Sequence, residues 1–425
     1  MKEKLNILLI GRGGRESALV KKMQESPRLA SLHTLPKQPG GSVSVDISPL
    51  DFDAIAAYCR QQAIDLVVVG PEAPIVAGLA DFLEERGIPT FAPSRLCGRL
   101  EGSKEFAKEF MSVNGIPSAR FMTVTTDTLE EGLEFLESQR PPYVVKADGL
   151  AAGKGVLITE DLNEAKFVMR EMLDGMFDES SSTVVLEEFL TGTEVSLFLA
   201  VSGSEYSVIA SARDYKRLHE DNKGPNTAGI GSISPSPLAD ETFVKKVEKS
   251  IIRPTLRGLS DLGLDYKGIL YLGLMDCSGF PMLLEYNVRF GDPETQAIMP
   301  RLDIDLIDLF EAVLEGNLPK QIAKRENCHT VAIVTAENGY PASVATGAEV
   351  IIPSDVPDCN VFYTGSVRVL EDGMLKVGGG RVATSVGIAS SFGEAYERAL
   401  KGAEMIVFDG KYYRTDIGKD LDATL

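Results

Sequence analysis

Short apolar runs alternate with amphipathic segments over the first hundred residues of the chain. Uninterrupted apolar runs are typical of buried parallel strands, whereas apolar residues three and four positions apart are typical of helices. The predicted strands span residues 7–10, 66–69 and 90–92, and the predicted helices span residues 16–24, 51–62 and 75–86. This alternation predicts an open parallel sheet covered by helices, a Rossmann-like domain over residues 1–100.

The pattern changes after this domain. A helix is predicted over residues 103–114, and strand-rich sequence with glycine-containing and charged turns follows it. Antiparallel strands with flanking helices fit this part, which gives an α+β domain over residues 101–312. A charged segment poor in apolar residues, 320–327, is the predicted linker. Beyond it, short strands and one helix at 392–406 predict a small C-terminal α/β domain over residues 328–425, so the fold class is multidomain, α/β and α+β.

Two turns of the N-terminal domain follow predicted strands and carry charged residues. Ligands of open α/β sheets lie beyond the carboxyl ends of the strands, so the turns 11–16 and 70–72 are candidate substrate contacts. The first turn does not match the dinucleotide-binding fingerprint, because Glu16 replaces the third small residue and the second strand offers no acid. A nicotinamide cofactor is therefore not expected, although the start of the helix can still hold a phosphate. The candidate contacts are Gly13, Gly14, Arg15, Glu16 and Glu72.

Residues 283–294 combine an apolar strand pattern with several charged side chains. Glu285 and Asn287 are two positions apart, so a strand directs both to the same face, with Arg289 beyond them. A carboxylate and an amide oxygen suit a hard cation such as Mg²⁺, which fills its other positions with water and substrate phosphates. Alternating polar residues also mark the solvated face of an ordinary strand. The metal site is favoured because Arg289 and the acidic turn after it carry more charge than a plain surface turn.

A second stretch, residues 143–158, places two lysines around a loop of small residues. Glycine and alanine let backbone N–H groups approach anionic oxygens, and Lys146 and Lys154 add positive charge. The spacing differs from that of the Walker phosphate-binding loop, and the Ser or Thr that would bind Mg²⁺ is missing. The loop, which includes Gly153 and Gly155, is thus a predicted cover over a triphosphate, with a glycine-rich hairpin as the alternative.

Three further segments bear on this chemistry. Lys104 stands in the first turn of a predicted helix, against the preference of helix N-termini for negative charge, which indicates an anion nearby. Residues 183–196 form a β-rich run that turns at a glycine and carries carboxylates placed to meet sugar hydroxyls. Residues 214–217 are a charged cluster, for which a solvated surface turn is the alternative.

Composition limits the classes of partner and compartment. The 425 residues suffice for several domains, with 44% hydrophobic and 25% charged residues as in ordinary globular proteins. A net charge of −19 argues against nucleic acid as a partner and makes lysines in glycine-rich loops more informative. The five cysteines form no Cys-x-x-Cys pair and the first apolar run is too short for a signal peptide, so a cytoplasmic protein with reduced thiols is expected. No apolar run reaches the length of about 18 residues expected of a membrane span.

In this order, the motifs resemble the ATP-grasp fold and, more narrowly, the phosphoribosylamine-glycine ligase family. The segments that carry the resemblance are 11–16, 69–72, 100–104, 145–156, 187–196, 224–227, 285–296 and 378–382. It implies an ATP-dependent carbon–nitrogen ligase that joins glycine to 5-phospho-β-D-ribosylamine through a glycyl phosphate. The products would be glycinamide ribonucleotide, ADP and phosphate, in de novo purine biosynthesis. The resemblance also implies small-molecule substrates, Mg²⁺ or Mn²⁺ beside ATP and a lid over about residues 118–190; a monomer is expected, with oligomers left open.

Roles at the ATP end follow from the same resemblance. The lysines would hold the ATP phosphates, the segment 187–190 the adenine and Glu194 the ribose. Glu285 and Asn287 would bind the metal. The full set implied for ATP is Lys104, Lys146, Gly153, Lys154, Gly155, Glu187, Glu188, Phe189, Leu190 and Glu194.

The resemblance also implies roles for residues near the reacting groups, the γ-phosphate of ATP, the glycine and the amine. Arg289 would stabilise the charge that develops on the transferred phosphoryl group. Asp214 or Asp292 would bind the ammonium group of glycine. The further substrate contacts are Lys216, Asn226, Thr227 and Arg381.

The chain departs from the family pattern at several positions. Arg12 and Ser17 stand where the family usually has serine and histidine, the loop 36–41 is shorter, and Tyr215 replaces an expected histidine. The run 226–231 also differs at two of its six positions. All of these are expected near the phosphoribosylamine, so they put the identity of the amine in question. Two alternatives stay open, namely a related carboxylate–amine ligase with an altered amine substrate and a catalytically idle nucleotide-binding relative. The intact ATP and metal motifs speak against the idle relative.

Overall fold

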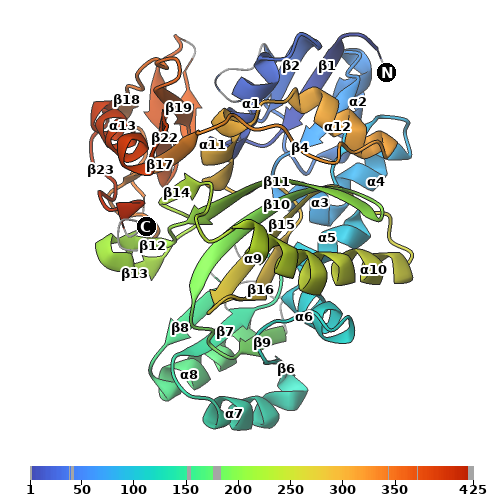
Figure 1. The fold of residues 1–425 in the computed structure, drawn as a ribbon, viewed down its shortest axis with the longest axis vertical. Helices are drawn as coiled ribbons and strands as arrows, with labels where there is room; N and C mark the ends of the chain where they lie inside the picture. The colour runs from blue at the N-terminus through green and yellow to red at the C-terminus, as the bar shows by residue number, and fades with distance from the viewer. Residues whose placement is uncertain are drawn as a thin grey trace.

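A computed structural model describes residues 2–37, 39, 43–150, 155–175, 183–342, 344–370 and 372–419. Within this part of the chain the main elements are a parallel N-terminal sheet, a long central sheet and a small sheet at the opposite end of the molecule (Figure 1). Two short sheets, a two-stranded one and a three-stranded one, accompany the central sheet.

The N-terminal sheet is parallel, with the strand order β3-β2-β1-β4-β5. Its strands are β1 (Leu5–Ile10), β2 (Leu29–Leu35), β3 (Val43–Ser44), β4 (Leu66–Val69) and β5 (Thr90–Phe91). Its helices are α1 (Gly14–Gln24), α2 (Phe52–Gln61), α3 (Glu72–Ala77), α4 (Leu79–Glu84) and α5 (Arg95–Gly102). The predicted parallel α/β sheet is confirmed. The single helix predicted over residues 75–86 is wrong, because Gly78 ends α3 in the left-handed conformation (φ 96°) and α4 begins after it.

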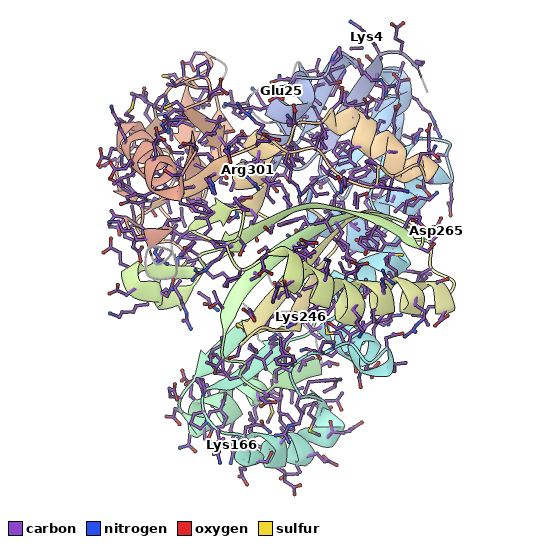
Figure 2. The ribbon with its side chains drawn as sticks, in the orientation of Figure 1. Lys4, Glu25, Lys166, Lys246, Asp265 and Arg301 are labelled. Atoms are coloured by element: carbon purple, nitrogen blue, oxygen red, sulfur yellow. The ribbon has the colours of Figure 1, made fainter. Side chains whose placement is uncertain are left out.

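The small sheet is antiparallel and has the order β6-β9-β7-β8. Its elements are β6 (Phe121–Thr125), η1 (Thr126–Thr128), α7 (Leu129–Ser138), β7 (Tyr143–Ala147), β8 (Val156–Thr159), α8 (Leu162–Leu173) and β9 (Thr183–Glu187). Val145, Met169 and Leu186 belong to an apolar cluster confined to this unit, which therefore has a core of its own. Its helices cover the outer face, where Lys166 of α8 lies far from the rest of the chain (Figure 2). The preceding helix, α6 (Lys104–Val113), lies beside the sheet (Figure 1).

The central sheet has the order β16-β15-β10-β11-β14-β17-β22-β19, with β23 paired to β17. Its strands are β10 (Thr193–Ser202), β11 (Glu205–Asp214), β14 (Gly231–Ser234), β15 (Lys267–Cys277), β16 (Phe280–Asn287), β17 (His329–Glu337), β19 (Asn360–Thr364), β22 (Arg381–Ala389) and β23 (Lys411–Tyr412). The helices around it are α9 (Glu241–Val247), η3 (Glu248–Ile252), α10 (Arg253–Asp261), α11 (Glu294–Ile298), η4 (Met299–Arg301), α12 (Leu306–Glu315) and α13 (Phe392–Met405). The two-stranded sheet consists of β12 (Arg217–His219) and β13 (Lys223–Asn226), which are joined by η2 (Glu220–Asn222). The three-stranded sheet consists of β18 (Glu349–Val350), β20 (Val367–Val369) and β21 (Leu375–Val377). The C-terminal strands thus continue the same sheet.

The junction between the N-terminal, central and C-terminal parts is tied by buried polar contacts. Arg301 lies at this junction (Figure 2) and donates to the carbonyl oxygen of Cys328 at 2.7 Å and to Oγ of Ser234 at 2.8 Å. These contacts join η4, which follows α11, to the end of β14 and to the residue before β17. None of the helices within the described ranges is long and apolar enough to cross a membrane.

Candidate active site

The end of β16 gathers the three side chains that its alternation directs to one side. Nδ2 of Asn287 lies 3.5 Å from Oε1 of Glu285, and Oδ1 of Asn287 accepts a hydrogen bond from Arg289 at 3.0 Å. The Glu285 side chain is half exposed, at 49%. Burial raises the pKa of Glu285, but the positive charges of Lys216 and Lys146 outweigh this and hold it below the usual value. An ionised carboxylate and an amide oxygen are ligands that suit a hard divalent cation, although here the amide nitrogen of Asn287 is the atom that faces the carboxylate.

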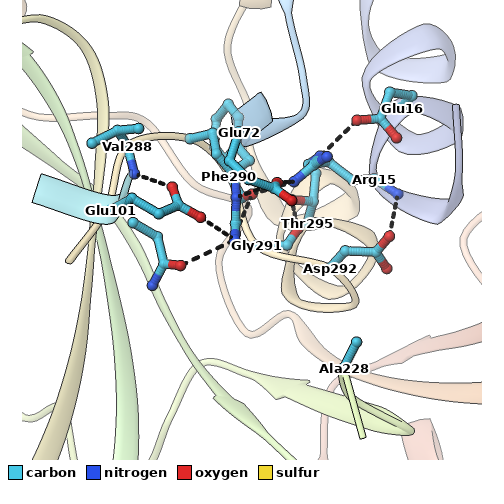
Figure 3. Close-up of polar contacts among 12 residues, drawn as sticks. Arg15, Glu16, Glu72, Glu101, Ala228, Val288, Phe290, Gly291, Asp292 and Thr295 are labelled. Atoms are coloured by element: carbon cyan, nitrogen blue, oxygen red, sulfur yellow. Dashed lines mark hydrogen bonds and ion pairs between the residues drawn. The ribbon is translucent and has the colours of Figure 1, made fainter. Parts of the chain in front are cut away.

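Arg289 is held between two carboxylates, those of Glu101 and Glu72, which Figure 3 labels. Its terminal nitrogen donates to Oε1 of Glu101 at 2.6 Å, and its Nε lies 3.3 Å from Oε2 of Glu72. The second oxygen of Glu101 accepts from the backbone N–H of Val288 at 2.8 Å. Burial opposes the charge of Arg289, yet Glu101 and Glu72 raise its pKa, so the guanidinium stays charged. Glu101 lies in the segment 100–104 that carries the resemblance but was not among the predicted site residues, because nothing in the sequence shows its partner.

The two N-terminal turns meet beneath this arginine. Nε of Arg15 pairs with Oε1 of Glu16 at 2.6 Å, and NH1 of Arg15 lies 3.9 Å from Glu72 and 3.2 Å from the carbonyl oxygen of Phe290. The backbone N–H of Arg15 faces the Asp292 carboxylate at 3.5 Å (Figure 3). Burial raises the pKa of Glu16. Arg15 and Glu16 are buried, so they brace the segment after β16 and do not line an open surface.

A cavity of about 600 Å³ opens on the other side of these turns. The predicted substrate contacts that line it are Gly13, Gly14, Asn226, Thr227, Asp292 and Arg381. Arg12 also lines it and is exposed, which gives the cavity two arginines. Arg381 donates to the carbonyl oxygens of Ala228 at 2.8 Å and of Asp292 at 2.7 Å, and lies 3.3 Å from the Asp292 carboxylate. Burial opposes the charge of Arg381, but Asp292 raises its pKa, so the cavity wall carries a fixed positive charge.

Tyr340 is a cavity residue that the sequence did not indicate. Its hydroxyl accepts a hydrogen bond from the backbone N–H of Ala228 at 3.0 Å, and a side chain at Gly380 would overlap its ring. Conversely, two departures from the family pattern do not line the cavity. Ser17 accepts a hydrogen bond from the backbone N–H of Thr364 at 3.1 Å, and Tyr215 is buried against the C-terminal part. Four residues near the shortened loop, 38 and 40–42, lie outside the described ranges.

Lys104 lies at the start of α6 with a carboxylate next to it. Oδ1 of Asp148 accepts hydrogen bonds from the backbone N–H groups of Lys104 at 2.6 Å and of Glu105 at 3.2 Å. The anion expected near this helix start is therefore, at least in part, a side chain of the same protein. Nζ of Lys104 donates to the carbonyl oxygen of Gly149 at 2.8 Å, and burial lowers its pKa.

Lys146 shares a carboxylate with a lysine that was not predicted. Its Nζ lies 2.6 Å from Oε1 of Glu187, while Oε2 of Glu187 lies 2.8 Å from Nζ of Lys108. The Glu187 carboxylate is thus already paired with two lysines and is not available to an adenine. Glu188 and Phe189 after it are exposed and Leu190 is half-buried. The loop residues Gly153 and Lys154 lie outside the described part of the chain, and Gly155 accepts a backbone hydrogen bond from Ala147 at 2.8 Å.

Asp214 is the last residue of β11, and Lys216 lies two positions after it. Lys216 lies 3.0 Å from Oε2 of Glu194 and 3.9 Å from Glu285, so it links the predicted ribose contact to the predicted metal ligand. Asp214 is half-buried, and its buried Oδ1 atom has no hydrogen-bond partner among the described residues. Burial and the nearby Glu294 raise the pKa of Asp214 well above its usual value. A side chain at Gly229 would lie 2.7 Å from that oxygen, which puts Asp214 next to the cavity segment 226–229.

More distant structures share the architecture. The biotin carboxylase from Campylobacter jejuni, described as a complex with β-γ-ATP, has a TM-score of 0.74 at 16% identity and covers 97% of this chain and 93% of its own. A biotin carboxylase domain from Hydrogenobacter thermophilus gives a TM-score of 0.73 at 13% identity, covering 97% of this chain and 92% of its own. At such identity the likeness extends to the fold alone.

Closer relatives cover the chain from end to end. Residues 5–101, 102–295 and 330–420 match, in turn, the models of the N domain, the ATP-grasp (A) domain and the C domain of phosphoribosylglycinamide synthetase. The phosphoribosylamine–glycine ligase of Caldanaerobacter subterraneus is 40% identical over 417 residues, 97% of this chain and 99% of the relative. That of Pseudomonas aeruginosa is 40% identical over 422 residues, 97% of each chain. The crystal structure of the Thermotoga maritima ligase gives a TM-score of 0.84 at 34% identity, covering 97% of this chain and 100% of its own. The fold is therefore the ATP-grasp fold, and the chain belongs to the phosphoribosylglycinamide synthetase family.

Proposed function

We propose that this protein is the ATP-dependent ligase that joins glycine to 5-phospho-β-D-ribosylamine, giving glycinamide ribonucleotide, ADP and phosphate in de novo purine biosynthesis. The observation that carries the proposal is a continuous series of polar contacts from the predicted metal ligands to the cavity. Asn287 contacts Arg289, Arg289 contacts Glu72, and Glu72 lies near Arg15. The backbone of Arg15 in turn faces Asp292 at the cavity. Such a series suits a reaction that starts on ATP and ends on a second substrate.

The ATP end is formed by the small sheet and α6. Lys104 and Lys146 hold the triphosphate, and the loop with Gly153, Lys154 and Gly155 covers it. The main chain of residues 187–190 meets the adenine, since the Glu187 carboxylate is occupied by two lysines. Glu194 meets the ribose hydroxyls.

Glu285 and Asn287 would hold a divalent cation, Mg²⁺ or Mn²⁺, together with phosphate oxygens and water. The bound ion would neutralise charge on the triphosphate. The residues fit this role, since the carboxylate is ionised and Oδ1 of Asn287, which accepts one hydrogen bond from Arg289, has a second lone pair for a cation.

The reaction has two steps. In the first, a carboxylate oxygen of glycine bonds to the γ-phosphorus while the bond from that phosphorus to the bridging oxygen breaks, so ADP leaves and glycyl phosphate forms. Arg289, fixed by Glu101 and Glu72, stabilises the charge spread over the transferred group. In the second, the amine nitrogen of phosphoribosylamine bonds to the glycyl carbonyl carbon, phosphate leaves with the bonding pair, and the amine loses a proton.

Asp214 binds the ammonium group of glycine. Its buried Oδ1 lacks a hydrogen-bond partner among the described residues, whereas the Asp292 carboxylate already accepts from Gln296 at 2.7 Å and lies near Arg381. The cavity takes the phosphoribosylamine, with Arg12 and Arg381 as the positive charges that face its phosphate.

ADP release tests this proposal directly. Purified protein is incubated with MgATP and glycine, with and without freshly generated phosphoribosylamine. ADP that forms only with phosphoribosylamine supports the proposal. ADP that forms only with another amine favours the ligase with an altered amine substrate, and no ADP with any amine or carboxylate favours the idle relative. The division at residues 100, 312 and 328, the lid at about 118–190, a monomeric state and a cytoplasmic location remain predictions.

A further inference from the structure

Lys108 is a buried lysine that none of the proposed steps uses. It lies on α6 four positions after Lys104, and its side chain is 3% exposed. Its Nζ lies 2.8 Å from Oε2 of Glu187, and this ion pair is its only polar partner among the described residues. The other oxygen of the same carboxylate lies 2.6 Å from Nζ of Lys146. One buried carboxylate therefore bridges two ammonium groups.

Stability does not account for this arrangement. A buried ion pair is often no more stable than apolar side chains of the same size, because both charges lose their hydration. Burial lowers the pKa of Lys108, although the attraction of Glu187 opposes this. With one carboxylate shared between two lysines, Lys108 also keeps N–H groups that have no partner in the part of the chain that the structure describes. A methionine would fill the same space without these costs, so the charge itself is the property to explain.

The charges of the three side chains have a consequence for the phosphates. Two lysines and one carboxylate carry a net charge of about +1, whereas Lys146 and Glu187 alone would form a neutral pair. The Lys146 side chain is 14% exposed and Lys108 is 3% exposed, so Lys146 is the member that can reach a ligand. In a chain of net charge −19, a triphosphate depends on local positive charge.

We infer that Lys108 is a positioning residue for ATP: it takes up one oxygen of Glu187, so that Lys146 keeps an uncompensated positive charge directed at the triphosphate. This inference rests on the proposed function, through the assignment of Lys146 to ATP. Lys108 and Lys104 share one face of α6, since they are four residues apart. α6 therefore contributes to phosphate binding in two ways, directly through Lys104 and indirectly through Lys108.

The test compares the affinities of purified full-length variants for MgATP and for adenosine, measured by calorimetry or by displacement of a fluorescent nucleotide. Lys108→Met leaves a neutral cluster and is expected to weaken MgATP binding about tenfold, with adenosine binding unchanged. Glu187→Gln leaves two positive charges and is expected to keep or strengthen MgATP binding. The double variant again carries one positive charge and is expected to recover most of the affinity. Lys245→Met, which removes an exposed lysine on α9, is the matched control and should have no effect.

A structural role would give a different result. Equal losses for MgATP and adenosine in Lys108→Met, or an affinity for MgATP within twofold of that of the unmodified protein, would overturn the inference. If Lys108→Met does not fold, the sign of the effect in Glu187→Gln decides, because a loss of MgATP affinity there contradicts the charge balance. An unmodified protein that binds neither MgATP nor adenosine would instead overturn the proposed function, which separates the two failures.

Discussion

Replacing Glu101 by glutamine tests how far the fixed position of Arg289 matters. Each oxygen of Glu101 accepts one hydrogen bond, from Arg289 at 2.6 Å and from the backbone N–H of Val288 at 2.8 Å. Glutamine has the same shape but only one acceptor oxygen, so its amide group would face one of these two donors. The loss of a charge-assisted hydrogen bond and the unpaired buried donor together cost about 3 kcal/mol. Glu72, 3.3 Å from Arg289, keeps the guanidinium charged and Asn287 still accepts from it, but the short contact with residue 101 that helps to fix its terminal nitrogen is weakened.

This cost should appear mainly in the transition state, where Arg289 faces the transferred phosphoryl group. About 3 kcal/mol corresponds to a fall of roughly a hundredfold in kcat for ADP formation, with smaller changes in the KM values. Glu248→Gln is the matched control, because Glu248 also pairs with an arginine, Arg253, at 2.6 Å but on the surface, where such pairs contribute little. Steady-state ADP release at saturating substrates measures both. A kcat within twofold of that of the unmodified protein in Glu101→Gln, or an equal fall in Glu248→Gln, would refute the reasoning.

Three further predictions address the metal, the glycine and the backbone. Glu285→Ala should abolish turnover and weaken MgATP binding in calorimetry, since one of two oxygen ligands is lost; near-normal turnover would contradict the metal assignment. The pKa of Asp214 is raised by burial and by Glu294, and an ammonium needs its ionised form, so the KM for glycine should rise as the pH falls through a midpoint above the usual aspartate value. Asp214→Asn should raise the KM for glycine at all pH values and abolish its increase at low pH. An increase of this KM at low pH that persists in the variant would argue against Asp214 as the group that binds the ammonium. Gly229→Ala should raise the KM for glycine and lower the unfolding temperature, because φ is 105° and the new methyl lies 2.7 Å from Asp214 Oδ1. Gly263→Ala has φ 70° and open space, so it should cost only about 1 kcal/mol of stability and leave that KM unchanged.

The end of β16 shows what local sequence can predict. Side chains alternate along a strand, so the two-residue spacing of Glu285, Asn287 and Arg289 is enough to put them on one side. The structure brings the three within hydrogen-bond distance of one another in sequence order. The parallel N-terminal sheet was predictable for the same reason, because its apolar runs and amphipathic helices are local patterns.

The partners of these residues could not be predicted, because they are far away in the sequence. Glu101 lies 188 positions from Arg289, and it resembles any acid on an amphipathic helix. Lys108 has the same difficulty, since a lysine on such a helix usually faces solvent and only the packing of α6 against the small sheet buries it. Asp148 shows a different limit. The helix start did indicate an anion, but no local pattern identifies that anion as a side chain of the same chain.

Fixed carboxylates accompany the cations at both ends of the site, and this bears on how the site binds anions. Three such pairs are Lys146 with Glu187, Lys216 with Glu194 and Arg289 with Glu101. Each carboxylate limits the rotation of its cation, so the cations need little rearrangement when charge develops on the transferred group. Each also cancels positive charge, and a fully neutral set of pairs would attract a triphosphate poorly. The net attraction must therefore come from cations in excess of carboxylates, of which Lys108 is the buried case and the exposed Arg12 is the case at the cavity, since Arg381 lies beside Asp292. Variants of Lys108, Lys146 or Glu187 that shift this balance by one charge should consequently change MgATP affinity in the direction of the charge, whichever of the three is replaced.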